Sequence, residues 1–254
     1  MDEQIHYQYN KEQQFGIITL NRAEKRHAIS KEMTTKFLHC IELAKKDPLK
    51  FLIVTSTGER MFCSGGDLND LHGELSPNEA EEILLIMMEV LYQLAVFPVP
   101  TIALLNGGAT GGGCELASAC DIRIAKHGTK FGFVQTKLGI IPGWGGGVLL
   151  AKRVAPSFAN QWIMEGTVYN ADDLALKGWV HRVVTDSQWD DRDNLLKAYT
   201  SKSYKQMKIL KELYLEEIGV IGLKKRMEKE VRYCASLWDS EEHKEAVSAF
   251  LNRS

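Results

Sequence analysis

The chain has 254 residues, of which 44% are apolar and 25% charged, and its formal net charge is -2. These values predict a folded protein with a sizeable core and exclude a disordered chain or a strongly basic nucleic-acid-binding surface. The longest apolar stretches are short and interrupted by charges, so no membrane span is expected. The five cysteines lack paired or metal-site spacing, and no signal-peptide pattern is visible, which favours a reduced cytoplasmic protein.

The first half of the chain alternates between β-branched runs and helical patterns. Strands are predicted at residues 15–20, 51–55 and 101–105, and the second is apolar throughout, as expected for a strand buried on both faces. Helices are predicted at about residues 31–47 and 77–97, each after a capping serine. Strands that alternate with helices predict an α/β fold.

The second half is less regular and ends in helices. The change of pattern near residue 190 predicts two parts, a core at residues 1–190 that carries the site and a helical region at residues 191–254. The predicted elements of this half are a helix at 114–119, strands at 120–125 and 129–133, a further strand within 179–184, and helices at 204–215, 223–237 and 241–251.

A run of five glycines at residues 107–113 follows a predicted strand and precedes a helix. Glycine has no Cβ, so such a loop can bring backbone N–H groups close to a ligand. The run ends in Gly113-Cys114-Glu115 without the lysine of a P-loop, and no dinucleotide-binding register fits. An oxyanion hole needs only two converging N–H donors, and the Gly65-Gly66 turn can supply the second. The competing interpretation is that these glycines allow close strand–helix packing.

Five segments together resemble the enoyl-CoA hydratase/isomerase (crotonase) superfamily, in the right order and over nearly the whole chain. They are LNRAEKRHAIS at 20–30, MFCSGGDL at 61–68, NGGATGGGCELASACD at 106–121, GIIPGWGG at 139–146 and the C-terminal segment at 240–251.

The resemblance implies an α/β fold in which repeated β-β-α units form a spiral, followed by a C-terminal helical region used in forming trimers or hexamers. It implies an acyl-CoA substrate, no metal or redox cofactor, and an oxyanion hole formed by the N–H groups of Gly66 and Gly112. The residues that it implies for binding coenzyme A or substrate are Lys25, Arg26, Ala28, Ser64, Gly65, Asp67, Leu68, Gly111, Pro142 and Trp144.

The two positions that carry glutamates in hydratases of this family are Glu115 and Gln135. Glutamine can bind water but cannot exchange a proton at neutral pH, so a two-glutamate mechanism is in doubt. Hydration through Glu115 is the first hypothesis. A second is decarboxylation of a methylmalonyl- or ethylmalonyl-type CoA ester, because the segment at 133–146, with Trp144, resembles ethylmalonyl-CoA decarboxylases. The third is a non-catalytic acyl-CoA-binding protein.

Overall fold

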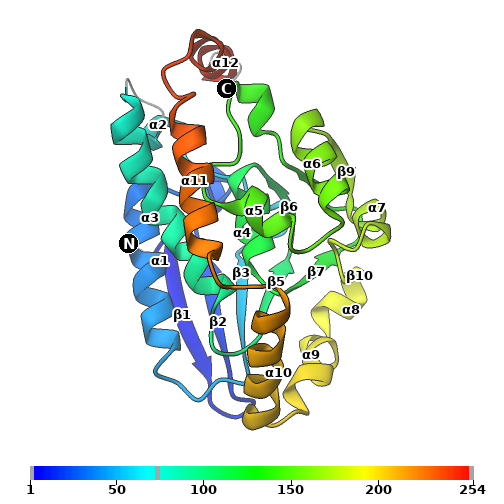
Figure 1. Cartoon of the computed structure of the whole chain (residues 1–254). Coiled ribbons are helices and arrows are strands. Elements are labelled where there is room, and N and C mark those ends of the chain that lie inside the picture. Colours follow the sequence, from blue (N-terminus) through cyan, green and yellow to red (C-terminus); the bar gives the residue numbers. More distant parts are fainter. Residues whose placement is uncertain (1–2, 72–74, 252–254) are drawn as a thin grey trace.

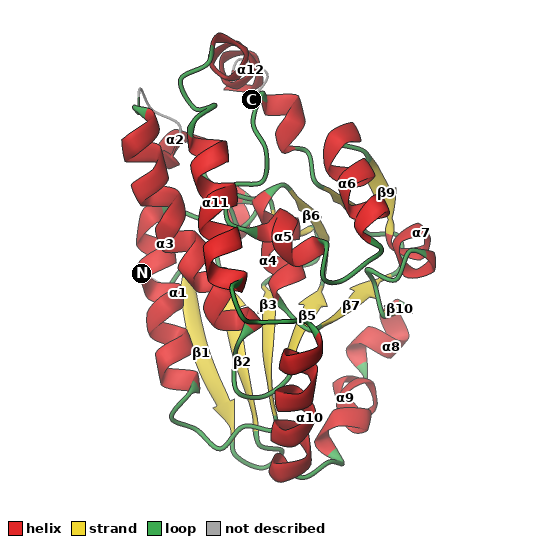
Figure 2. Cartoon of the chain, in the orientation of Figure 1, coloured by secondary structure: helices red, strands yellow, loops and turns green. Residues whose placement is uncertain are grey.

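The computed structural model describes residues 3–71 and 75–251. Two β-sheets with helices packed around them form the fold (Figures 1 and 2). The larger sheet has the strand order β1 (Ile5–Asn10), β2 (Phe15–Leu20), β3 (Phe51–Ser56), β5 (Thr101–Leu105), β7 (Ile122–Lys126) and β10 (Arg182–Val184), and the smaller has the order β4 (Met61–Cys63), β6 (Gly108–Thr110), β8 (Lys130–Gly132) and β9 (Val168–Asn170).

Successive turns of the chain add one strand to each sheet. β3, β5 and β7 pair in parallel in the larger sheet, and β4, β6 and β8, which follow them, pair in parallel in the smaller one. A helical segment comes after each pair of strands. This arrangement confirms the expected spiral of β-β-α units, and it places the loops after β4 and β6 next to each other.

β3 is buried on both faces, as its apolar sequence predicts. Leu52 and Val54 point into one hydrophobic core, whereas Phe51 and Ile53 point into a second core on the opposite face. Successive side chains of a strand alternate between faces, so one strand contributes to two cores. β1, by contrast, was not predicted. It is an edge strand in which Ile5 alone is fully buried, and a mostly polar hexapeptide gives no apolar periodicity.

The helices cover both faces of the larger sheet. α1, α3 and α11 lie side by side, and α11 also contacts α5 (Figure 1). The predicted capping box at Ser76 is present. The helical elements are η1 (Ala23–Lys25), α1 (Lys31–Ala44), α2 (Leu68–Leu71), α3 (Pro77–Ala95), α4 (Gly112–Ala119), η2 (Gln135–Leu138), α5 (Gly146–Leu150), α6 (Pro156–Glu165), α7 (Ala171–Leu176), α8 (Asp186–Asp190), α9 (Arg192–Thr200), α10 (Tyr204–Glu217), α11 (Leu223–Ala235) and α12 (Glu241–Leu251).

The C-terminal helices share the cores of the sheet. Trp189, Leu195 and Met207 of α8, α9 and α10 pack in the same core as Phe51, whereas Met227 of α11 packs in the other. α12 contacts η2. Within one chain, residues 191–254 thus pack against the core. The division at residue 190, which assigns assembly to the C-terminal part, stays a prediction.

Candidate active site

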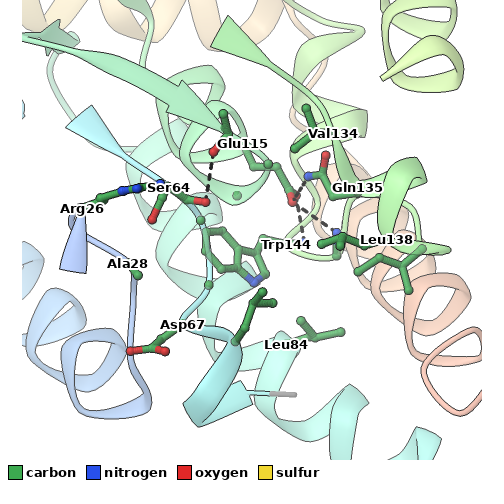
Figure 3. A pocket seen from close by; sticks show the side chains of 18 of the residues that line it. Arg26, Ala28, Ser64, Asp67, Leu84, Glu115, Val134, Gln135, Leu138 and Trp144 are labelled. Carbon is green, nitrogen blue, oxygen red and sulfur yellow. Dashed lines mark hydrogen bonds between the residues drawn. The ribbon is translucent and has the colours of Figure 1, made fainter. Parts of the chain in front are cut away.

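A cavity of about 1090 Å³ opens between the spiral core and the C-terminal helices. Figure 3 shows Arg26 and Ala28 on one side of it, Gln135 and Leu138 on the other, and Trp144 between them. The described residues that line it are Glu24, Lys25, Arg26, Ala28, Met61, Ser64, Gly65, Gly66, Asp67, Leu68, Leu84, Thr110, Gly111, Gly112, Glu115, Val134, Gln135, Leu138, Ile140, Ile141, Gly143, Trp144, Cys234 and Trp238.

Nearly all of the residues implied by the resemblance lie in this cavity. The exception is Pro142. It is buried, and it is not among the described residues that line the cavity, although its neighbours Ile141 and Gly143 are. Lys25 and Arg26 are exposed at the opening, and Leu68 lines the wall at the start of α2.

The two glycine turns meet because β4 and β6 are parallel neighbours. Gly65 has φ +100° and Gly111 has φ +54°, conformations that favour glycine. A Cβ atom on Gly65 would lie 3.1 Å from the backbone nitrogen of Gly112. Neither the N–H of Gly66 nor that of Gly112 donates a hydrogen bond to any residue that the structure describes. Two such donors on adjoining loops are what an oxyanion hole requires.

Other glycines of the same run serve packing instead. A Cβ atom on Gly113 would lie 2.0 Å from the carbonyl oxygen of Cys63, and one on Gly107 would lie 2.4 Å from the backbone nitrogen of Met61. The packing interpretation therefore holds at Gly107 and Gly113, and the oxyanion-hole interpretation stays a prediction for Gly66 and Gly112. The close packing at Gly107 and Gly113 is what brings the loop against β4.

Glu115 lies in the first turn of α4 and is 2% exposed. Its Oε1 accepts hydrogen bonds from Gln135 Nε2 at 2.8 Å and from the N–H of Gly143 at 3.3 Å. Its Oε2 accepts from the N–H groups of Trp144 and Gly146, both at 2.9 Å. None of the ion pairs found among residues 3–71 and 75–251 involves Glu115. Four neutral donors thus hold this carboxylate.

Glycines in the loop before α5 allow this contact. Gly145 has φ +80°, and a Cβ atom on Gly146 would lie 2.2 Å from Cβ of Glu115. Burial raises the pKa of Glu115, and its hydrogen bonds to Trp144, Gly146, Gln135 and Gly143 only partly oppose that increase. A carboxyl group whose pKa lies above its usual range can take up and return a proton closer to neutral pH.

Glu230 of α11 is a second carboxylate beside this loop, and no sequence pattern pointed to it. It accepts hydrogen bonds from the N–H groups of Gly147 at 2.9 Å and Val148 at 2.7 Å. Burial, and then the charge of Glu115, raise the pKa of Glu230 to about 8. In sequence, Glu230 is one acidic residue among the many charges of a helix. Because 83 residues separate it from Gly147, no local sequence pattern predicts their contact.

Gln135 is 7% exposed and lies in η2. Its Nε2 donates to Glu115, whereas its Oε1 accepts no hydrogen bond from the part of the chain that the structure describes. Gln135 therefore fixes the position of Glu115 and leaves an acceptor buried at the cavity wall.

Trp144 both packs and lines the cavity. A Cβ atom on Gly112 would lie 2.3 Å from the indole ring, which is therefore in close contact with the backbone of the Gly111-Gly112 turn. The residue is 4% exposed, and its backbone N–H binds Glu115. These contacts link the glycine loop and the carboxylate through one residue.

An ion pair fastens the N-terminal loop to the Gly65-Gly66 turn. Arg22 Nη1 donates to Asp67 Oδ2 at 2.6 Å and to the carbonyl oxygen of Ala28 at 2.9 Å. The N–H of Ile29 also donates to the carbonyl oxygen of Gly65 at 2.8 Å. Asp67 lines the cavity, but its carboxylate is paired with Arg22, a residue that the sequence had placed in a motif without giving it a role.

Residues 3–71 and 75–251 form neither a metal-binding cluster nor a membrane-spanning helix. No group of three or more His, Cys, Asp or Glu side chains within residues 3–71 and 75–251 could hold a metal ion. No helix in the same ranges is long and apolar enough to cross a bilayer.

Comparison with known proteins gives the family. Residues 10–254 match the enoyl-CoA hydratase/isomerase family, and the chain belongs to that family. It is 35% identical over 175 residues to the crotonyl-CoA hydratase of Syntrophomonas wolfei, an alignment that covers 68% of this chain and 67% of that protein. It is 33% identical over 193 residues to the mitochondrial methylglutaconyl-CoA hydratase of Mus musculus, with 75% of this chain and 61% of that protein covered.

Among solved structures, the enoyl-CoA hydratase of Bacillus halodurans has the same fold. Its TM-score is 0.87 at 25% identity, over 97% of this chain and 100% of that chain. The crotonase fold expected from the motifs is thereby confirmed.

Proposed function

We propose that this protein adds water to a 2-enoyl-CoA thioester and forms a 3-hydroxyacyl-CoA. The observation that carries the proposal is the buried carboxylate of Glu115, held by neutral donors beside the N–H groups of Gly66 and Gly112. The similarity to hydratases of crotonyl-CoA and methylglutaconyl-CoA supports it. An oxyanion-hole donor typically contributes about 3 to 4 kcal/mol of transition-state stabilisation.

The proposed mechanism uses one carboxylate for both proton transfers. The thioester oxygen accepts hydrogen bonds from Gly66 and Gly112, which makes C3 of the enoyl group electrophilic. Water attacks C3 as Glu115 removes one of its protons, so that a C3–O bond forms and an enolate results. Glu115 then returns a proton to C2. One water is added in total, and the carboxylate ends as it began.

Oε1 of Glu115 is the oxygen that we assign to proton transfer. Its bond from the N–H of Gly143 is long, at 3.3 Å, whereas both bonds to Oε2 are 2.9 Å. The weaker hydrogen bond is the easier one to exchange for a water molecule. Gln135, which cannot transfer a proton, keeps Oε1 in place through its Nε2.

Coenzyme A is proposed to lie across the opening of the cavity. The exposed side chains of Lys25 and Arg26 can contact its phosphates. The backbone near Ala28 and the turn at 64–68 line the path from there to the two N–H donors.

A homotrimer or a dimer of trimers is proposed for the assembly. Ile209, Leu210 and Leu213 of α10 are 44%, 58% and 57% exposed, and such apolar side chains on one helix favour an interface. Light scattering on the purified protein would check the stoichiometry. Cytoplasmic localisation remains a prediction that cell fractionation would check.

Decarboxylation of a malonyl-type CoA ester is the second candidate, and Gln135 is the observation in its favour. Loss of carbon dioxide forms the enolate without a base, so the oxyanion hole and a proton donor suffice. This reaction would not need the second acid that Gln135 replaces.

Mass spectrometry of acyl-CoA esters incubated with the purified protein tests the proposal. The mixture would contain crotonyl-, longer enoyl-, methylmalonyl- and ethylmalonyl-CoA. A gain of one water by an enoyl ester is the expected result. Loss of carbon dioxide from a malonyl-type ester, with the enoyl esters unchanged, would establish the decarboxylase. Binding without any turnover would identify a non-catalytic acyl-CoA-binding protein.

A further inference from the structure

We infer that His27 is a positioning residue for the binding of coenzyme A. Its neutral imidazole holds the loop at residues 22–28 in the conformation that places Arg26 at the opening of the cavity, and acid releases this loop. His27 is 2% exposed and is not among the described residues that line the cavity, so it acts through the loop. The inference rests on the proposed function, since it concerns the coenzyme A end of the same site.

The loop has a backbone conformation that needs outside support. Arg26 has φ +52° and His27 has φ +54°, so two consecutive residues other than glycine are left-handed. Asparagine, aspartate and histidine tolerate this region better than other side chains, and arginine is not among them. Such a conformation persists only where the surroundings fix it.

The side chain of His27 supplies two of the contacts that fix the loop. Its Nδ1 accepts a hydrogen bond from the N–H of Arg22 at 3.0 Å, which closes the loop on itself. Its Nε2 lies 2.9 Å from the carbonyl oxygen of Thr57, directly after β3, which ties the loop to the larger sheet. Both partners are backbone groups of ordered segments, so the imidazole bridges two parts of the chain.

The loop in turn shapes the opening of the cavity. The carbonyl oxygen of Arg26 accepts a hydrogen bond from the N–H of Ser64 at 3.1 Å, and Figure 3 shows these two residues together at one edge of the cavity. Lys25, Arg26 and Ala28 line the cavity beside them. Release of the loop would displace the cations that we propose for the phosphates of coenzyme A. Glu115 lies on α4, so the effect should fall on binding rather than on proton transfer.

The two contacts of the imidazole admit one protonation state. A carbonyl oxygen can only accept and a backbone N–H can only donate, so Nε2 carries the proton and Nδ1 has none. In the imidazolium, an N–H at Nδ1 would face the N–H of Arg22, and that hydrogen bond would be lost. Burial lowers the pKa of His27, and the bond to Thr57 and the charge of Glu24 only partly oppose this. Protonation as the pH falls should therefore release the loop.

No carboxylate is placed to stabilise the protonated ring. None of the ion pairs found within residues 3–71 and 75–251 includes His27. The charged side chains around it are Arg22, Glu24 and Arg26 of its own loop, Glu59 and Arg60 after β3, and Asp67, which Arg22 binds. Glu24 and Glu59 are exposed, and Asp67 is already paired with Arg22.

The test is calorimetric titration of the full-length protein with butyryl-CoA between about pH 7.5 and 5.5, on either side of the usual pKa of histidine. The comparison is with His27→Asn, because asparagine tolerates the left-handed conformation and does not titrate. We expect the affinity of the unmodified protein to fall about tenfold more over this range than that of the variant. Ionisation of the phosphates of coenzyme A affects both proteins equally, so it cancels in the ratio.

A matched control is His39→Asn, which changes an exposed histidine on α1. This variant should keep the pH profile of the unmodified protein. His27→Ala removes both side-chain contacts at every pH, so KM for crotonyl-CoA should rise about tenfold at neutral pH while kcat stays within about twofold. A general loss of folded protein would lower kcat instead, and thermal unfolding of each variant would measure the folded fraction.

Two results would overturn the inference while the proposed function stands. They are an equal pH dependence in the unmodified protein and in His27→Asn, and an unchanged KM in folded His27→Ala, each with crotonyl-CoA still hydrated. If His27→Ala does not fold, the comparison with His27→Asn decides alone. If butyryl-CoA does not bind at any pH and crotonyl-CoA is not hydrated, the proposed function fails, and the inference fails with it.

Discussion

Glu115 and Asp121 are buried carboxylates near the two ends of α4, and the chain neutralises them in different ways. Glu115 is held by one side-chain amide and three backbone N–H groups. Asp121 accepts hydrogen bonds from the N–H and hydroxyl of Thr101 and is also paired with two cations: Lys211 Nζ lies 2.7 Å and 2.6 Å from its two oxygens, and Arg153 Nη2 lies 3.4 Å from Oδ1.

The two environments suit the two carboxylates to different roles. Lys211 Nζ lies 2.6 Å from Asp121 Oδ2, and this buried ion pair ties α10 to the sheet. Neutral N–H groups stabilise a carboxylate without adding a charge, and burial acts against ionisation. Glu115 can therefore change its protonation state, which acid–base catalysis requires.

The largest effect is expected from the glycine loop that packs against Trp144 beside Glu115. In Gly112→Val, the new side chain would collide with the indole of Trp144, whose ring lies 2.3 Å from the Cβ position. The N–H donor and the Trp144–Glu115 contact would both be displaced, and hydration of crotonyl-CoA should fall at least about 1000-fold. A rate near that of the unmodified enzyme would contradict the assigned oxyanion hole.

Glu115→Gln removes the carboxyl group that we propose transfers protons, and keeps its shape. We expect kcat for hydration to fall about 100- to 1000-fold, while binding of a saturated acyl-CoA stays within a few-fold. Stopped-flow or steady-state assays, together with titration of butyryl-CoA, would measure the two quantities. If kcat persists, Glu115 is a structural carboxylate like Asp121.

Lys211→Met tests the other half of the comparison. Asp121 would become a buried charge with one cation fewer, and the free energy of unfolding should fall by about 3 to 5 kcal/mol. Urea unfolding would measure this change. The hydration rate per folded molecule should stay within about twofold, because Lys211 does not line the cavity.

The last prediction concerns the pH dependence that Glu230 contributes. Its pKa of about 8 in the folded protein lies above its ordinary value of 4.5, so between these values the folded protein holds a proton that the unfolded chain releases. The free energy of unfolding should therefore fall as pH rises from about 5 to 8. Glu230→Gln should flatten this slope, and Glu228→Gln on the same helix should not. Urea unfolding at several pH values would check both variants.

The sequence predicted the parts of the site that depend on backbone geometry. Gly65 and Gly112 lie where two segments approach closely, and Gly66 and Glu115 stand within the same two motifs, so local patterns carry all four. The spiral fold followed from the same motifs, because parallel strands in two sheets bring successive turns together.

The parts that were missed depend on contacts between distant segments. Glu230 meets the N-terminus of α5 across 83 residues, and Arg22 meets Asp67 across 45. Such pairs leave no local pattern. The short helices at 146–176 were missed for another reason: five to ten residues with irregular burial give little periodicity.

Exchange of the α-protons of butyryl-CoA in D₂O, followed by NMR, tests the central claim most directly. This saturated ester cannot be hydrated, so exchange at C2 reports enolate formation and proton transfer alone. The account predicts that the unmodified protein catalyses the exchange and that Glu115→Gln does not. Exchange that persists in Glu115→Gln, or that is absent from the unmodified protein while butyryl-CoA binds, would contradict the account.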